Sequence, residues 1–170
     1  MPENELAQIM DHMPYGLYII GSKMADGVNA MMADWVMQVS FEPRLLAVSL
    51  ENDAHTLANL QADRFFSVNF LSAGEDSMHL AGRFAQPYFG AKVHGPQATG
   101  VHHKLLGIRH GLTEHGCPVL EEAMAWLECE AQDFVPVGDH TLAIAAVLTG
   151  HIVREGEPLT STFTGWNYSA

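Results

Sequence analysis

Two long β-type segments near the C-terminus constrain the fold more than any other feature. Residues 126–137 (WLECEAQDFVPV) and 140–153 (HTLAIAAVLTGHIV) are rich in residues that favour strands, and only Gly138 and Asp139 separate them. A Gly-Asp pair between two such segments is typical of a β-hairpin turn. The sequence therefore predicts a long antiparallel hairpin, and the fold must contain a sheet that accommodates it.

Shorter segments upstream predict further strands. They are residues 15–23 (YGLYIIGSK), 28–40, 45–50 (LLAVSL) and 65–71 (FFSVNFL). The apolar residues of 73–116 follow no regular helical or strand spacing, so a helix and long loops are expected there. Residues 159–168 could add a last strand or cross to a partner. Strands with few helices between them favour an antiparallel barrel over a doubly wound sheet. No repeat or low-complexity linker interrupts the chain, so we expect one domain over residues 1–170.

Two helices are expected near the N-terminal half of the chain. The first carries apolar residues at helical spacing, namely Leu6, Ile9, Met10 and Met13. The second carries Leu57 and Leu60, and Asp53 is its expected N-cap because a side-chain oxygen there can accept a first-turn N–H.

The charge balance excludes several classes of partner. The chain has a net charge of −12 and only eight Lys and Arg residues, whereas nucleic-acid binders neutralise phosphates with many cations. We therefore expect neither nucleic-acid binding nor docking on an anionic membrane, although a few cations and backbone amides could hold one small anion. Without a signal peptide, an apolar run of membrane-spanning length or a CxxC pair, the chain is expected to be cytoplasmic with two reduced, buried cysteines.

Several common active-site motifs are missing from the sequence. It contains no GxGxxG after a strand, no P-loop, no HExxH and no GxSxG. The histidines at 102, 103, 110 and 115 match no tetrahedral metal-site spacing, so they are expected to be exposed loop residues and no metal is predicted.

The most informative stretch is residues 27–40, GVNAMMADWVMQVS. From periodicity alone it is a strand, a turn of small residues and another strand, which an ordinary hairpin would explain. The stretch also resembles the flavin-binding signature of the flavin reductase-like, FMN-binding split-barrel family, which includes flavoredoxins and flavin reductase modules fused to rubredoxins. That signature runs approximately N-A-M-T-A-x-W-V-x-Q-V-S and precedes a proline and an apolar strand, which here are Pro43 and residues 45–50.

Further elements of this family follow in the same order along the chain. They are residues 52–56 (NDAHT), 65–71 (FFSVNFL), 127–129 (LEC) and 138–140 (GDH). The resemblance implies a mainly β fold, an antiparallel FMN-binding split β-barrel of Greek-key type with a few flanking helices. It also implies a homodimer with the flavin near the subunit interface.

The resemblance assigns a set of cofactor-binding residues. Asn29, Gln38 and Ser40 would hydrogen-bond the flavin rim or ribityl chain, and small residues would let the main chain approach the ring. Trp35 would either line the cleft or fill the core. Thr56 would donate to the phosphate or simply cap a first turn, and Arg83 and Lys92 would be either phosphate ligands or surface charges. The full set is Asn29, Ala30, Met31, Met32, Ala33, Trp35, Gln38, Ser40, Thr56, Arg83 and Lys92.

Two positions depart from the family pattern. Met32 stands where the family usually has Thr or Ser, so a hydroxyl beside the flavin would be missing. Lys92 lies in Ala91-Lys92-Val93, where an Asp-Lys-Phe element is expected.

The Gly138-Asp139-His140 element is implied to bind nicotinamide. His140 would position the coenzyme or supply a proton, unless it is only a polar residue beside a turn. The implied function is hydride transfer from NADH or NADPH to bound FMN, with FAD as the alternative flavin. Electrons would pass on to free flavin or to a rubredoxin-type partner. The alternatives are a flavin-bound electron carrier that does not react with NAD(P)H and a flavin-free binding module of the same fold.

Overall fold

The computed structural model describes residues 3–85 and 104–167. In these residues the helices are α1 (Glu3–Met10), α2 (His55–Asp63), α3 (Glu75–Phe84) and α4 (Ser161–Thr164). The strands are β1 (Tyr18–Met24), β2 (Gly27–Ala33), β3 (Val36–Ser40), β4 (Leu45–Glu51), β5 (Phe65–Phe70), β6 (His110–Leu112), β7 (Pro118–Leu120), β8 (Ala125–Val137) and β9 (His140–Ile152). Within them, no helix is long and apolar enough to cross a bilayer.

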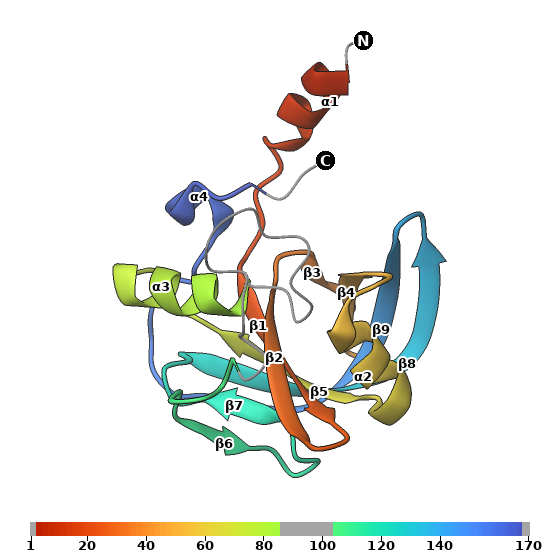
Figure 1. The fold of residues 1–170 in the computed structure, drawn as a ribbon, viewed down its shortest axis with the longest axis vertical. Helices are drawn as coiled ribbons and strands as arrows, with labels where there is room; N and C mark the ends of the chain where they lie inside the picture. The colour runs from red at the N-terminus through yellow and green to blue at the C-terminus, as the bar shows by residue number, and fades with distance from the viewer. Residues whose placement is uncertain (1–2, 86–103, 168–170) are drawn as a thin grey trace.

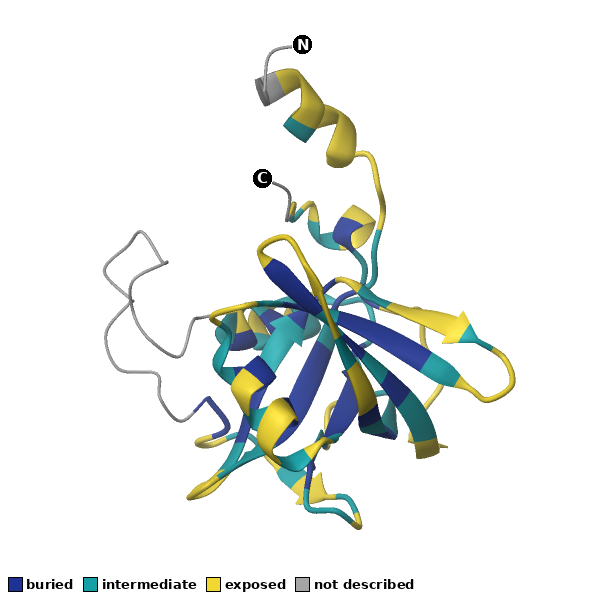
Figure 2. Ribbon diagram, turned by 90° about the vertical axis from the view of Figure 1, so that its right-hand side faces the viewer, coloured by how far each residue is buried: buried dark blue, intermediate teal, exposed yellow. Residues whose placement is uncertain are grey.

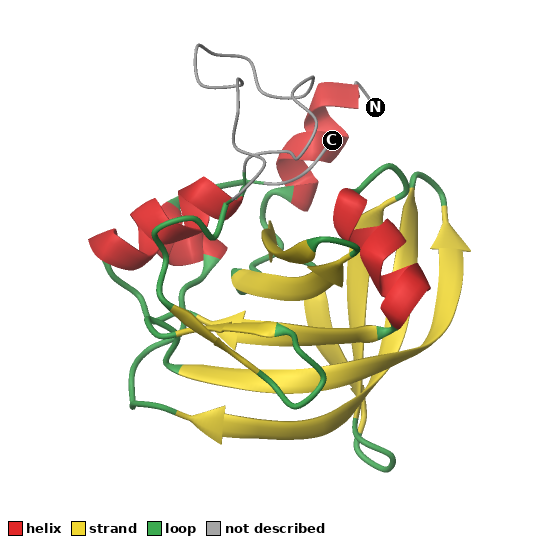
Figure 3. Cartoon of the chain, turned by 60° about the horizontal axis from the view of Figure 1, so that its bottom comes forward, coloured by secondary structure: helices red, strands yellow, loops and turns green. Residues whose placement is uncertain are grey.

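The main sheet is antiparallel and rolls into a barrel (Figures 1 and 3). Its strand order is β2-β1-β5-β8-β9-β4-β3, so β2 and β3 lie at opposite edges. Yet only Asp34 and Trp35 separate these strands in the chain, and the three Cα–Cα steps from Ala33 to Val36 span at most about 11 Å. The two edges must therefore meet, and the amide N of Ser49 on β4 donates to the carbonyl O of Trp35 at 2.9 Å.

The barrel interior is filled by the side chains on one face of the sheet. Alternate residues point inward, which is why the strands read as apolar residues at every second position. The interior cluster includes Ile20, Val48, Phe66, Val68 and Ala143, each at 0% exposure. The sequence-predicted mainly β, antiparallel split barrel is confirmed, and so is the β8–β9 hairpin, with Gly138 at φ +62° in its turn.

A second apolar cluster lies outside the barrel, between the outer face of β1 and β2, helix α3 and the C-terminal segment. Leu17, Ala30, Phe84 and Leu159 are all at most 2% exposed there. The C-terminal segment does not form the full strand considered from the sequence. It makes isolated bridges from Thr160 to Gly16 and from Pro158 to Ser72, and then enters α4.

Both helices predicted in the N-terminal half are present, as α1 and α2, but the predicted N-cap of α2 is wrong. The N-cap of α2 is Ala54, not Asp53, and no side chain caps this helix. Ala54 has the extended backbone of an N-cap at φ −67° and ψ 129°, so Asp53 lies one residue too early. Helix α1 extends away from the barrel, and its side chains are largely exposed (Figures 1 and 2).

Candidate functional site

The predicted flavin signature lies across the closure of the barrel. The predicted hairpin over residues 27–40 is wrong, because β2 pairs with β1 and β3 pairs with β4, and neither pairs with the other. The hairpin interpretation fails because the connecting residues lead from one barrel edge to the other, and the carbonyl O of Trp35 accepts the N–H of Ser49 on β4. We call Asp34 and Trp35, which join the two barrel edges, the seam.

The residues of β2 alternate between the two apolar clusters. Met31 and Ala33 pack on the barrel core, whereas Ala30 and Met32 pack on the outer cluster beside α3. Met32 is half-buried among apolar side chains there, which gives a packing reason for a methionine in place of a hydroxyl residue. Asn29 is 3% exposed, and its Oδ1 accepts the N–H of Ala30 at 2.8 Å.

Two of the predicted polar ligands, Gln38 and Ser40, lie in the C-terminal half of β3. Gln38 is exposed and its Nε2 donates to the carbonyl O of Ser40 at 3.0 Å, so these two residues bond to each other. The structure does not bring them to the seam cluster described next.

At the seam, the flavin signature meets the predicted nicotinamide element. The rings of Trp35 and His140 lie 5.0 Å apart at an interplanar angle of 38°. His140 is 9% exposed and opens β9, and its Nδ1 lies 2.7 Å from Oδ1 of Asp139. That contact fixes the orientation of the imidazole, because a carboxylate oxygen accepts from the ring N–H.

Asn52 ties the β8–β9 turn to the end of β4. Its Nδ2 donates to the carbonyl O of Gly138 at 3.2 Å, and its backbone N donates to the carbonyl O of Asp139 at 2.9 Å. The Thr141 hydroxyl donates to Oδ1 of Asn52 at 2.8 Å. The turn that precedes His140 is therefore held against the end of β4.

Asp34 is a buried carboxyl that the sequence analysis did not single out. Its side chain is mostly buried, and Oδ1 accepts the N–H of Trp35 at 3.0 Å. Burial raises the pKa of Asp34 to about 6, against the lowering effects of its backbone hydrogen bonds and of His140, while Glu51 raises it further. No sequence pattern marks this residue, because its burial follows only from barrel closure.

The structure describes two of the three predicted phosphate ligands. Thr56 is 2% exposed in the first turn of α2. Arg83 is half-buried on α3, and its guanidinium donates to the carbonyl oxygens of Lys104 and Leu106, so it anchors that segment. Lys92 lies outside the described residues.

Lys104 is a cation that the sequence analysis missed. It is 3% exposed, and its Nζ donates to the carbonyl O of Phe84 at 3.2 Å. Burial lowers the pKa of Lys104 to about 8. Its charge also lowers the pKa of His55, in the first turn of α2, after the larger effect of burial.

The other predicted elements are structural. Glu128 is 1% exposed and accepts the N–H of His115 at 3.1 Å, while the His115 ring stacks on Phe65 at 3.9 Å. His115 is thus half-buried, as is His110, so the exposed-loop prediction is wrong for these two histidines. Cys117 and Cys129 are both buried free thiols, as predicted.

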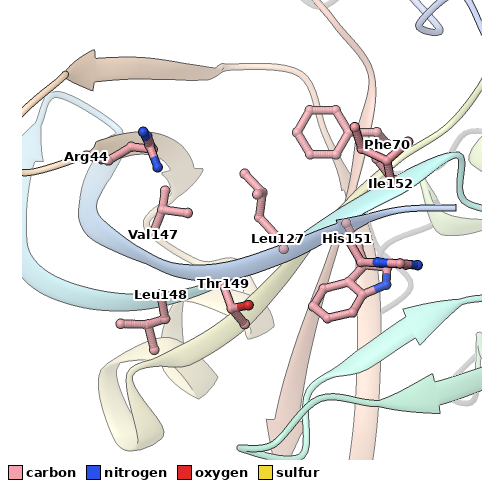
Figure 4. A pocket seen from close by; sticks show the side chains of 11 residues that line it. Arg44, Phe70, Leu127, Val147, Leu148, Thr149, His151 and Ile152 are labelled. Atoms are coloured by element: carbon pink, nitrogen blue, oxygen red, sulfur yellow. The ribbon is translucent and has the colours of Figure 1, made fainter. Parts of the chain in front are cut away.

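A pocket of about 390 Å³ lies elsewhere, at the ends of β5, β8 and β9 (Figure 4). Phe70, Leu127, Val147 and Ile152 contribute apolar surface to it, and Arg44 also lines it. None of the predicted flavin or nicotinamide residues lines this pocket.

Comparison with known proteins gives consistent matches. Residues 10–167 match the model of the flavin reductase like domain. The chain is 31% identical over 152 residues to a high molecular weight rubredoxin of Moorella thermoacetica, covering 89% of this chain and 62% of that protein. It is 30% identical over 160 residues to a putative diflavin flavoprotein A 3 of Nostoc sp., covering 92% of this chain but 25% of that protein.

Solved structures agree with the fold. The flavin reductase PheA2 superposes with a TM-score of 0.77 at 27% identity, covering 100% of this chain and 99% of that one. The NADH:FAD oxidoreductase SgcE6 of Streptomyces globisporus gives 0.76 at 26% identity, covering 94% and 90%. The chain therefore spans nearly all of these two structures, but less than two thirds of the two curated relatives.

Proposed function

This chain belongs to the family of flavin reductase-like domains, and on that basis we propose that it binds FMN and reduces it with a hydride from NAD(P)H. The observation that carries this proposal is the contact between Trp35 and His140. It joins the flavin signature and the Gly138-Asp139-His140 element, which are more than a hundred residues apart in the sequence, at one rigid site.

The residues present fit a flavin mononucleotide. The N-terminus of α2 has no side-chain cap, and the N-terminus of a helix favours an anion. Lys104 has three N–H donors and one hydrogen bond among the described contacts, to Phe84. We infer that Thr56, the α2 N-terminus and Lys104 hold the phosphate, while the β2 backbone from Asn29 to Ala33 borders the ring. Bound flavin would accept a hydride at N5.

The seam residues would orient the second substrate. Hydride transfer needs the nicotinamide ring stacked on the flavin and little acid–base assistance. Trp35 and His140 form an aromatic wall that could limit the coenzyme's position. Asp139 fixes the imidazole of His140, and Asn52 fixes the turn, so the wall is preorganised.

We propose that the protein is a homodimer through the outer face of β3, β4, β9 and β8. Because Ala143 and Ala145 face the barrel core, Leu142 and Ile144 on β9 face outward. Met37, paired in register with Ala47 and through it with Ile144, is 64% exposed. A sheet face that carries an exposed apolar side chain such as Met37 is typical of an interface. Met37→Asp should convert the dimer to a monomer in sedimentation equilibrium, and a parent that sediments as a monomer would contradict the proposal.

The electron acceptor and the flavin are inferred from the relatives. The name of the Moorella relative favours a rubredoxin-type acceptor, and the name of SgcE6 keeps FAD as an alternative flavin and NADH as the coenzyme. Whether the chain acts alone or with attached modules bears on the acceptor and not on the flavin site.

Two measurements test the proposed function. The purified protein should show a flavin absorption spectrum, or gain one on addition of FMN, and NADH or NADPH should bleach it under anaerobic conditions. A protein that binds FMN but is bleached by neither nucleotide is the flavin-bound electron carrier. A protein that binds neither FMN nor FAD is the flavin-free module, and the proposal is then wrong.

A further inference from the structure

The pocket at the ends of β5, β8 and β9 opens onto one end of the barrel core. Phe70, Leu127 and Val147 line it, and the same side chains pack against the buried core cluster of the barrel. Ile152, which is 68% exposed, and Arg44, which is also exposed, line its outer part. Figure 4 places these side chains on the same side of β9. The pocket is therefore apolar inside and charged at its border, in the mouth of a β-barrel, where ligand sites are common.

The backbone of β9 departs from a regular strand along this pocket. The β8–β9 register has no partner for Leu148, which lies between the paired residues Val147 and Thr149. At Gly150, a Cβ would lie 2.5 Å from Cδ2 of Leu127, so a glycine is needed for that side chain to lie this close to β9. A bulge of this kind re-aims side chains and is often found next to a functional site. The inner wall of the pocket therefore depends on this irregular stretch of β9.

Arg44 brings an unpaired charge to the pocket. No hydrogen bond or ion pair joins its guanidinium to any of the described residues, whereas the other Lys and Arg residues that the structure describes each have a partner in the protein. Those six are Lys23, Arg64, Arg83, Lys104, Arg109 and Arg154. The described residues that line the pocket include no Asp or Glu, in a chain that has twenty of them. An anion at the border of the pocket would therefore meet one free cation and no facing carboxylate among these residues.

The size and the lining of the pocket limit what it can bind. Its volume of about 390 Å³ lies near the lower end of the range of roughly 300–1,000 Å³ that is typical of ligand pockets, so it suits a molecule with one ring better than a dinucleotide. Phe70 offers an aromatic surface beside the aliphatic side chains of Leu127 and Val147, and a planar apolar ring packs well against both. The guanidinium of Arg44 is a planar fork of donors that matches the two oxygens of a carboxylate.

We propose that this pocket is a binding site for a small aromatic carboxylate, whose ring lies against Phe70, Leu127 and Val147 and whose carboxylate is held by Arg44. Binding would be reversible, with no bond made or broken. The inference goes beyond the proposed function and does not depend on it, because none of the residues assigned above to the flavin or to the coenzyme lines the pocket.

The test measures binding of two probes, phenylpropionate and its neutral amide, phenylpropionamide, to the flavin-free protein by methyl NMR. The ring current of a bound probe should shift the methyl signals of Leu127, Val147 and Ile152. The methyl signals of Leu112, which is exposed on β6 and outside the pocket, should stay unchanged. The parent should bind the carboxylate with a dissociation constant of about 1 mM, as expected for a ligand of this size, and the amide about fivefold more weakly.

Substitutions separate the contribution of the charge from that of the apolar surface. Arg44→Met should weaken binding of phenylpropionate about fivefold, which corresponds to about 1 kcal/mol, and should change binding of the amide by less than about twofold. Ile152→Asn should weaken binding of both probes by a similar factor of about threefold, because it removes apolar surface and no charge. Arg109→Met and Leu112→Asn, at exposed positions outside the pocket, are the matched controls and should bind both probes as the parent does.

Several outcomes overturn the proposal. Absence of methyl shifts in the parent at about 10 mM of either probe refutes the site, as would be found if a second copy of the chain covered the pocket. Equal binding of acid and amide by the parent, or an unchanged affinity for the acid in Arg44→Met, refutes the carboxylate class. Displacement of the probe by FMN would show that the probe occupies the flavin site, and the proposal is then wrong. A protein that binds no flavin contradicts the proposed function alone, because the probes are tested without flavin. If circular dichroism shows that Arg44→Met does not fold, Arg44→Gln takes its place.

Discussion

Asn69→Ala should destabilise the protein strongly without weakening flavin binding. Asn69 lies in residues 65–71, one of the segments that resemble the family, yet it is fully buried and its contacts are structural. Its Nδ2 donates to the carbonyl O of Ile19 at 3.1 Å and of Pro118 at 3.3 Å, and its Oδ1 accepts the N–H of Leu120 at 2.8 Å. One amide therefore holds β7 against β1 and β5.

The expected magnitude follows from these contacts. Truncation leaves the N–H of Leu120 without its acceptor at a position only 2% exposed, at a cost of about 1–3 kcal/mol. The lost Nδ2 bonds add about 1 kcal/mol, since a net hydrogen bond contributes about that much. The sum, about 2–4 kcal/mol, is a large share of the roughly 5–15 kcal/mol by which a domain is stable.

Urea unfolding of the flavin-free protein, followed by tryptophan fluorescence at one protein concentration, measures this loss. Gln132→Ala, which removes an exposed amide on β8, is the matched control and should change the unfolding free energy by less than about 0.5 kcal/mol. The FMN dissociation constant should be the same in both variants at low temperature. An unchanged unfolding free energy in Asn69→Ala, or a tenfold loss of FMN affinity without a stability loss, would refute the reasoning.

Two further changes test the barrel and the phosphate site. Gly21→Ala should lower the free energy of unfolding in urea by about 1–3 kcal/mol, because a Cβ there would collide with the Ser67 hydroxyl and with the backbone of Pro118. Gly74→Ala is the control and should be nearly neutral, because a Cβ at that position meets open space. Lys104→Met should weaken FMN binding about tenfold or more, as loss of a charge-assisted hydrogen bond would, and the exposed Arg109→Met should not. In the flavin-free protein the pKa of Lys104 is lowered to about 8, so its charge is lost as pH rises through 8. Fluorescence titrations at pH 7 and 9 should therefore show weaker FMN binding at pH 9 in the parent but not in Lys104→Met. Equal affinities at the two pH values would remove Lys104 from the phosphate site.

The strands were predictable because each has an apolar side that must be buried. Alternation and composition alone located β1, β4, β5, β8 and β9. The β6–β7 pair was not predictable, because three-residue strands carry no period and depend on Asn69 and on Pro118 for their place. The N-cap of α2 was misplaced by one residue because a side-chain oxygen is only one of several ways to begin a helix.

The site was only partly predictable. The resemblance named Trp35 and His140 independently, but only closure of the barrel brings them together. Periodicity cannot distinguish a hairpin from a seam, since both alternate with period two and differ only in which distant strand each half joins. Lys104 and Asp34 were missed for a related reason, because the burial of a charged side chain depends on tertiary packing and leaves no local signal.

The burial of Asp34 has a cost in stability that can be measured. Its pKa in the folded protein is raised from 3.8 to about 6, so the folded state binds a proton more tightly than the unfolded state between these values. The stabilisation is present at low pH and is lost as pH rises through 6, and the ionised carboxylate costs on the order of 2–3 kcal/mol above that. Asp34→Asn should therefore unfold at a higher urea concentration than the parent at pH 7.5 and at a similar one at pH 4. A variant that is less stable than the parent at pH 7.5 would contradict this reasoning, because it would show that the carboxylate makes stabilising contacts that outweigh the cost of its burial.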